Sequence, residues 1–378
     1  MRNKLNIINP ITYHGWDKLL LSNQEYSFFH SSHWAKVLCE SYGYKPLYFV
    51  DILNSNLKRS APSTSNYLDA PHAMLSAPGS LRAVSHKELL TCIPVMEVKS
   101  FLTGRRGVSL PFTDYCEPII EKTISIQDIF SYLTEYGKQV GWKYIEIRGN
   151  GNSPHDLPVS SYYYGHILDL SQNEEQIFSG FRSSTRRNIK KAIKEGVKVN
   201  VSNSLKSIRE FYRLNCITRK DHGQPPQPYY FFKKIYDHII SKNYGMVVSA
   251  SYKGKIIAGA VYFHFGKKAL FKYGASDKKY QHVRANNIVM WEAIKRYCKQ
   301  GYSTFCFGRT EQENPGLRQF KSGWGAEEKI IKYYKYDLKK SAFLNGNSRM
   351  SELHNKVFNK MPIPLLKVVG SVLYKHIG

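Results

Sequence analysis

The spacing of apolar residues along the chain alternates between the period of a helix and the period of a strand. In the first half, residues 28–50 indicate a capped helix around Trp34 and Leu38, followed by a strand after Pro46. Residues 54–84 are rich in Ser, Asn, Ala and Pro without a sustained period, so we expect a surface loop or insertion there. The other elements expected in this half are strands over 89–98, 108–112 and 118–120, a helix over 126–140 and a strand over 143–148.

The second half repeats this order on a larger scale. Its pattern predicts helices over 174–195, 204–219, 228–241 and 285–300, strands over 246–252, 255–265, 268–275, 304–308 and 329–338, and a helical turn near 315–321. Two successive units of this kind indicate an α/β fold with a duplicated domain. We therefore expect an N-terminal domain at 1–165, a C-terminal domain at 166–340 and a tail at 341–378.

Length and charge fit two domains that meet an acidic partner. The 378 residues exceed the ~250–300 at which one hydrophobic core stops growing. Lys and Arg number 55 against 29 Asp and Glu, which leaves a net charge of +26. Such a surface attracts phosphate, nucleic acid and anionic lipid alike, so charge alone does not choose among these partners.

Several classes of protein lack their diagnostic residues in this chain. The six cysteines include no C-x-x-C pair and have no histidine at zinc-ligand spacing, so we expect reduced, mostly buried thiols and no metal site. No G-x-S-x-G, H-E-x-x-H or Walker A sequence occurs, which argues against a nucleophile-elbow hydrolase, a zincin and a P-loop enzyme. The first residues lack the apolar stretch of a signal peptide, so we expect a cytoplasmic protein.

Three arginines begin a strongly basic helix within residues 182–198. On a helical wheel Arg182 and Arg186 lie at the border between the apolar stripe and the charged face, and Arg187 lies on the charged face. A half-desolvated guanidinium holds a phosphate more strongly than an exposed lysine does. The alternatives are a structural ion pair for the border residues and an ordinary solvated face for Arg187.

A second candidate anion site is the start of the helix expected over 285–300. Arg284, Asn286 and Asn287 stand at this helix start, shortly after a strand. Helix N-termini present unpaired N–H groups and the positive end of a dipole, so such a junction can hold pyrophosphate. A simple helix cap of the same composition is equally consistent with these residues.

Residues 307–325 form the densest polar stretch and follow directly after an apolar strand. Lys321 and Arg309 can stabilise an oxyanion or a phosphate, and Phe320 and Trp324 can form the wall of a dry slot. The alternative is a tight bend that carries a surface lysine. Among nearby carboxylates, Glu311 is our candidate for the general base, with Glu313 and Asp277 left unranked beside it.

In combination, three stretches resemble the FemAB-like branch of the GNAT superfamily. They are FRSSTRRNIKKAIKEGV, GKIIAGAVYFHFGKKALFKYGASD and ANNIVMWEAIKRYCKQGYSTFCFGRTEQENPGLRQFKSGWGAE, and residues 28–50 and 108–118 resemble that family's first domain. The resemblance implies two tandem GNAT-like domains. It also implies acyl transfer to an amine of a peptidoglycan or exopolysaccharide precursor, with no bound cofactor and with aminoacyl-tRNA or acyl-CoA as co-substrate.

The same resemblance assigns roles to single residues. The family's Phe-Lys pair corresponds to Phe320 and Lys321, with the lysine stabilising charge at the carbonyl. Arg182, Arg186 and Arg187 correspond to candidates for an acceptor diphosphate, and Tyr273 lies in the second matching stretch as a further substrate-binding candidate. Two departures stand out: no long coiled-coil arm is present, and Asn286 and Asn287 replace the glycines of a CoA-binding loop.

The tail leaves two interpretations open. Residues 339–378 are basic, and 362–374 add a cluster of apolar residues. Such a segment can lie on the anionic inner face of a membrane, or it can dock as a helix on the second domain. Two other classes of function also stay open: a non-catalytic nucleic-acid binder, which uses a basic surface rich in tyrosine, and a scaffold for envelope assembly.

Overall fold

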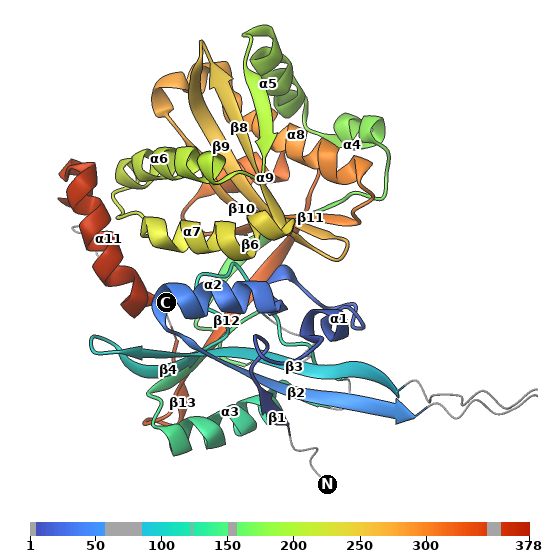
Figure 1. Ribbon diagram of the computed structural model, residues 1–378, viewed down its shortest axis with the longest axis vertical. Helices are drawn as coiled ribbons and strands as arrows, with labels where there is room; N and C mark the ends of the chain where they lie inside the picture. Colours follow the sequence, from blue (N-terminus) through green and yellow to red (C-terminus); the bar gives the residue numbers. More distant parts are fainter. Residues whose placement is uncertain (1–4, 57–84, 122–123, 150–156, 346–356) are drawn as a thin grey trace, which may run out of the picture.

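The computed structural model describes residues 5–56, 85–121, 124–149, 157–345 and 357–378 (Figure 1). Within them, thirteen strands form one mixed sheet in the order β1-β2-β3-β4-β5-β12-β6-β11-β10-β9-β8-β7, with β13 paired to β12. Most helices cover the faces of this sheet. The α/β class predicted from the sequence is confirmed.

The first half contributes the lower part of the molecule in Figure 1. The helix predicted over 126–140 and the capped helix predicted around Trp34 and Leu38 are both present, whereas α1 was not predicted. The Ser31 side chain accepts from the Trp34 amide at the start of α2, and Gly43, at φ 73°, follows its end. The elements are β1 (Asn6–Ile8), α1 (Trp16–Leu20), α2 (Ser32–Tyr42), β2 (Lys45–Asn56), β3 (Ser85–Ser100), β4 (Gly104–Val108), α3 (Ile126–Val140) and β5 (Tyr144–Arg148).

The second half forms the upper part, with α8 on one face of its strands and α6 and α7 on the other. Its elements are β6 (Ser161–Asp169), α4 (Glu174–Gly180), α5 (Ser183–Lys194), β7 (Lys198–Ser202), α6 (Leu205–Asp221), α7 (Tyr229–His238), β8 (Gly245–Tyr252), β9 (Lys255–Phe265), β10 (Lys268–Ser276), α8 (Ala285–Lys299), β11 (Thr304–Thr310), α9 (Pro315–Ser322), β12 (Glu327–Asp337), β13 (Ala342–Phe343) and α11 (Ile363–Ile377).

Several predicted elements are wrong. The single helix expected over 174–195 is two helices, because Phe181 adopts an extended conformation that turns its ring into the core against Trp291 and Trp324. The strand expected over 108–112 ends at Val108, and the segment at 118–120 forms only an isolated bridge between Cys92 and Ile119. Strands β6 and β7 were not predicted. Residues 57–84 of the expected loop lie outside the described residues, and 54–56 belong to β2.

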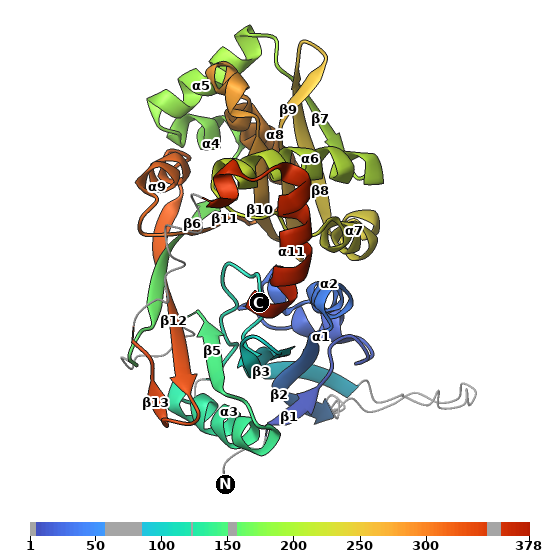
Figure 2. The same cartoon turned by 90° about the vertical axis from the view of Figure 1, so that its left-hand side faces the viewer.

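Strand β12 joins the two halves into one sheet. It pairs with β5 of the first half, where Tyr333 is opposite Arg148, and with β6, where Glu327 is opposite Ile167 (Figure 2). Strand β6 crosses residue 165, where the sequence places the domain boundary; that boundary stays a prediction.

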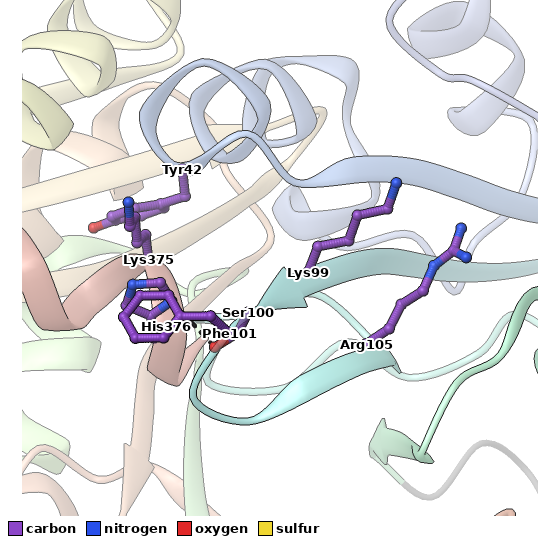
Figure 3. A pocket seen from close by; sticks show the side chains of 7 residues that line it. All are labelled: Tyr42, Lys99, Ser100, Phe101, Arg105, Lys375 and His376. Atoms are coloured by element: carbon purple, nitrogen blue, oxygen red, sulfur yellow. Dashed lines mark hydrogen bonds between the residues drawn. The ribbon is translucent and has the colours of Figure 1, made fainter.

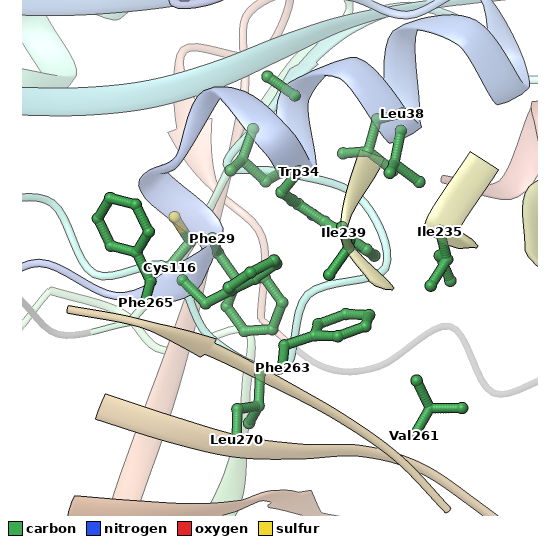
Figure 4. Close-up of a cluster of buried hydrophobic side chains, with 14 of the residues drawn as sticks. Phe29, Trp34, Leu38, Cys116, Ile235, Ile239, Val261, Phe263, Phe265 and Leu270 are labelled. Carbon is green, nitrogen blue, oxygen red and sulfur yellow. The ribbon is translucent and has the colours of Figure 1, made fainter. Parts of the chain in front are cut away.

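The two halves also share a hydrophobic core. Trp34 of α2 packs against Phe231 of α7, with ring centroids 6.1 Å apart. It also packs against Phe263 of β9, at 5.9 Å between centroids (Figure 4). Trp34 is completely buried. Because truncating such a ring to alanine costs about 3–5 kcal/mol, this contact alone strongly resists separation of the halves.

Helix α11 lies across the junction of the two halves, packed on α6, β3 and α2. No helix among the described residues has the length and apolar character needed to span a bilayer.

Candidate active site

The site begins where two parallel strands separate. Strands β10 and β11 pair only from Lys268 opposite Thr304 to Leu270 opposite Cys306, although both strands continue further. The next residues of each strand are therefore free of the other. Ligands of α/β proteins commonly bind at the carboxyl ends of parallel strands where neighbouring strands part.

A bulge in β11 widens this opening. The pairing of β11 with β6 shifts between Cys306 and Arg309, and Gly308 adopts φ +69°, which favours glycine. A Cβ at Gly308 would lie 3.2 Å from the carboxylate carbon of Asp114, so the glycine also allows a loop of the first half to approach. The opening is thus built by both halves.

Lys321 reaches this bulge from α9. Asn314 caps that helix by accepting from the Leu317 amide, and Pro315 begins it, which directs the last turn at β11. The side chain is buried, with 2% of the residue exposed, and its Nζ donates to the carbonyls of Gly308 and Arg309 at 3.1 and 2.8 Å. This burial excludes the alternative of a surface lysine on a tight bend.

Burial lowers the pKa of Lys321 to about 8, and the nearby Asp114 carboxylate opposes part of that shift. Arg309 and Lys272 lower the pKa further because they are like charges. An ammonium has three N–H donors, and two are used by backbone carbonyls. The third can be directed at an oxygen that becomes negative during a reaction.

Two other cations lie near Lys321: Lys272, whose side chain is 4% exposed, and the half-buried Arg309. The Lys272 ammonium donates to Asp114 Oδ2 at 2.9 Å and to the Phe112 carbonyl at 2.8 Å. Arg309 donates to the Tyr333 hydroxyl at 2.8 Å and lies 4.3 Å from the centroid of the Tyr163 ring. Within the described residues, Asp114 is therefore the carboxylate shared by this group of cations.

The sequence analysis did not identify His166 of β6 as a site residue. It is fully buried, its Nε2 lies 3.1 Å from Glu328 Oε2, and burial together with the charge of Lys321 lowers its pKa. Glu328 is held in turn by Arg318 at 2.6 Å. A neutral imidazole beside Lys321 can accept a proton. Because β6 itself was not predicted, no sequence signal pointed to this histidine.

A cavity of about 660 Å³ lies between the halves on one side of this opening. Its walls include Leu270 and Cys306, the last paired residues of the two diverging strands. Phe29, His30 and Tyr115 contribute walls from the first half. The cavity therefore borders the point at which β10 and β11 separate.

The three predicted acceptor arginines lie beside the end of α9. The Arg182 amide donates to the Gly323 carbonyl at 3.0 Å, which places the start of α5 two residues from Lys321. Arg182 and Arg187 are exposed and Arg186 is half-buried. Within the described ranges none of these three side chains forms a hydrogen bond or an ion pair. Their role in binding stays a prediction.

The remaining predicted residues are distributed over three places. Trp324 is fully buried against Phe181 and Phe307, and Phe320 is half-buried beside it, so this pair backs α9 rather than facing solvent. Tyr273 packs on Phe232 in the core shared by the halves. Glu311 is exposed just beyond β11.

The predicted donor residues do begin α8. Arg284 is exposed at φ 59°, Asn286 donates to the Ser276 hydroxyl at 3.1 Å, and Asn287 is buried. Donor binding there stays a prediction.

This chain is similar to known acyl- and aminoacyltransferases in sequence and in fold. Residues 179–322 match the acetyltransferase (GNAT) domain. Lipid II:glycine glycyltransferase of Staphylococcus haemolyticus (strain JCSC1435) is 22% identical over 236 residues, covering 43% of this chain and 56% of that protein. The same enzyme of Staphylococcus epidermidis (strain ATCC 12228) is 33% identical over 86 residues, covering 21% of each. The crystal structure of FemX shares the fold with a TM-score of 0.59 at 13% identity, over 87% of this chain and 96% of that one.

Residues 179–322 thus carry a GNAT domain, and these similarities support the resemblance to the FemAB-like branch of the GNAT superfamily. The predicted resemblance and the GNAT-like fold are confirmed. The chain spans little more than half the length of the first staphylococcal relative and about a fifth of the second. The GNAT match ends at residue 322 and so includes the diverging strands and Lys321.

Proposed function

We propose that this protein transfers an activated acyl or aminoacyl group to an amine of a cell-envelope precursor. The observation that carries the proposal is the position of Lys321. This lysine is buried where two parallel strands separate, and two of its three N–H groups donate to backbone carbonyls, which leaves the third for a substrate oxygen. Developing negative charge on a carbonyl oxygen is stabilised best by donors fixed in advance in a dry site.

The chemistry is attack of a neutral amine nitrogen on the donor carbonyl. The new C–N bond forms as the carbonyl oxygen becomes negative, and Lys321 donates to that oxygen. Collapse breaks the C–O bond of an ester donor or the C–S bond of a thioester donor, and the amine proton passes through a base to the leaving group. Glu311 is our candidate base from the sequence, unranked against Glu313 and Asp277. His166 is a further candidate because it is buried and because burial and the charge of Lys321 lower its pKa.

The acceptor class follows from the relatives. Both staphylococcal relatives are named as Lipid II:glycine glycyltransferases, which supports an anionic, diphosphate-containing lipid intermediate as the acceptor. Arg182, Arg186 and Arg187 are the residues that we assign to its diphosphate. The absence of side-chain partners for them among the described residues supports that assignment, because a phosphate would satisfy them.

The donor is either an aminoacyl ester of tRNA or an acyl thioester of CoA. The GNAT domain supports acyl-CoA, whereas the glycyltransferase relatives support an aminoacyl donor. In both cases Arg284, Asn286 and Asn287 at the start of α8 are the residues that we assign to donor phosphate.

A transfer assay tests the proposal. Purified protein is incubated with a Lipid II acceptor and either glycyl-tRNA or a panel of acyl-CoA thioesters, and the product is detected by its mass. The proposal expects product with one donor class and loss of product in Lys321→Ala. No product with any donor, together with tight RNA binding that Lys321→Ala leaves intact, would instead favour a nucleic-acid binder.

A further inference from the structure

The basic tail forms a helix that both halves hold in place. On its inner face Gly370 approaches the loop before α7 so closely that a Cβ would lie 2.0 Å from the Pro226 carbonyl oxygen. The Tyr374 hydroxyl donates to the Pro225 carbonyl at 3.1 Å and accepts from Arg219 at 2.6 Å. The expectation of a docked helix is thus met, although α11 docks on the first half as well as on the second.

The outer face of α11 is nevertheless apolar and exposed. Leu365, Val368 and Val372 follow helical spacing along one stripe, with 49%, 59% and 52% of each residue exposed. A helix that only closed the junction of the halves would gain nothing from aliphatic side chains on this face. We therefore expect this stripe to contact an apolar surface outside the protein.

The turn between β3 and β4 extends the same apolar face. Phe101 is 81% exposed and Leu102 is 55% exposed at its tip. The Phe101 ring lies 4.5 Å from the His376 ring, centroid to centroid, and the His376 Nδ1 lies 3.1 Å from the Ser100 hydroxyl (Figure 3). Two segments more than 260 residues apart in sequence thus meet, and Figures 1 and 2 show the hairpin and α11 on one side of the molecule.

Positive charges surround these apolar residues. Residues 357–378 and 98–108 contain no Asp or Glu, while Lys99, Lys367 and Lys375 are exposed. Glu97, the carboxylate next to this turn, is buried and bonded to Arg105 at 2.8 Å. The face therefore carries apolar side chains inside a cationic margin, the combination that binds an anionic lipid surface.

We propose that α11 and the β3–β4 turn together dock the protein on an anionic membrane surface. This proposal rests on the proposed function, because a lipid-linked acceptor stays in the membrane. With fifteen residues, α11 is shorter than the ~20 that a spanning helix needs, so it lies in the plane of the interface. Phe101 and the α11 stripe enter the headgroup region and the lysines meet lipid phosphates.

Vesicle flotation tests the membrane surface. Full-length protein is mixed with vesicles of phosphatidylcholine alone or with about one-third phosphatidylglycerol, a fraction at which roughly 1 kcal/mol per lysine is available. We expect binding to the anionic vesicles and little binding to the neutral ones. Two double variants, Phe101→Ser with Leu102→Ser and Val368→Ser with Val372→Ser, each weaken partitioning by about tenfold or more.

Leu53→Ser is the matched control. Leu53 is 47% exposed near the end of β2, which points to the opposite side of the molecule from the β3–β4 turn (Figure 1), so this variant should partition as the wild type does. Equal partitioning of the wild type and both double variants would overturn the inference. Self-association that both double variants abolish, without vesicle binding, would also overturn it, since the face would then join two copies.

The membrane surface and the proposed transfer fail separately. Lys321→Ala should float with anionic vesicles as the wild type does. Transfer to an acceptor that lacks the lipid chain should proceed in the Phe101 and Leu102 double variant at the wild-type rate. Transfer activity without vesicle flotation would contradict the membrane-binding proposal alone. Vesicle flotation without transfer activity would contradict the proposed function alone.

Discussion

Two groups of cations lie next to each other at the end of α9, and they differ in how much water they meet. Lys321 and the Lys272 side chain are buried and Arg309 is half-buried, and all three are held by carbonyls, a carboxylate or a tyrosine hydroxyl. Arg182 and Arg187 are exposed, Arg186 is half-buried, and all three lack side-chain partners within the described residues.

This difference suggests that the Lys321 group acts in the chemical step, whereas the arginines bind and release the acceptor. A buried cation keeps one position and has its pKa set by its surroundings, which suits a group that must meet charge as it develops. An exposed guanidinium without an ion pair keeps its charge and its donors for a diphosphate that arrives and leaves. The predictions below test whether this division holds.

The largest effect is expected from Lys321→Ala. Removing one donor from an oxyanion site typically costs 10²–10³ in kcat, so we expect a loss of about 10³-fold, or about 4 kcal/mol in the barrier. The measurement is kcat in the transfer assay. Lys190→Ala on the exposed face of α5 is the matched control and should change kcat less than about twofold. A Lys321→Ala rate near that of the control would contradict the account.

Replacing Lys321 should stabilise the fold even though it removes activity. Burial depresses the Lys321 pKa from 10.5 to about 8, a penalty on the charged form of about 3 kcal/mol at neutral pH. Lys321→Met removes this penalty but leaves the Gly308 and Arg309 carbonyls without their donor, at about 1 kcal/mol each. We therefore expect the free energy of unfolding of Lys321→Met at pH 7 to exceed that of the wild type by about 1 kcal/mol.

The pH dependence of that difference has a fixed sign. Between pH 8 and 10.5 the unfolded chain holds the Lys321 proton while the folded chain has lost it, so wild-type stability rises with pH relative to Lys321→Met. The advantage of the variant should shrink and reverse over this window. Urea denaturation of both proteins from pH 7 to 10.5 measures it, and a difference that does not vary with pH would show that Lys321 is not desolvated.

The last prediction concerns the arginines at the start of α5, which lack side-chain partners within the described residues. Arg186→Gln should raise KM for the acceptor by about tenfold, or about 1.4 kcal/mol, and leave kcat within about twofold, because it removes binding that is equal in the ground and transition states. Lys190→Gln, from the same helix, is the matched control. A loss in kcat with unchanged KM would place Arg186 with Lys321, Lys272 and Arg309 instead.

The sequence predicted the cationic residues better than their surroundings. Helix caps such as Ser31 and Gly43 are local signals, and α2 lies close to where they place it. The resemblance singled out Lys321, whose role stays a prediction, but it did not indicate that the side chain is buried against the Gly308 and Arg309 carbonyls at the β11 bulge. Such contacts between distant segments leave no periodic pattern. For the same reason β6, and with it His166, was missed.

The exposed patch illustrates a further limit. The apolar residues of the tail were visible in the sequence, and docking on the protein and binding to a membrane looked like alternatives. The helix instead buries Leu366, Gly370 and Tyr374 on one face and exposes Leu365, Val368 and Val372 on the other. Its junction with Phe101 arises only from folding.

The pH dependence of kcat/KM for transfer tests the central role of Lys321 most directly. If the protonated amine of Lys321 meets the oxyanion, kcat/KM should fall as pH rises through about 8, where the buried lysine loses its proton. Lys321→Ala should lose this falling limb together with most of its rate. A wild-type profile that stays flat from pH 7 to 10, or a Lys321→Ala profile with the same limb, would contradict the account.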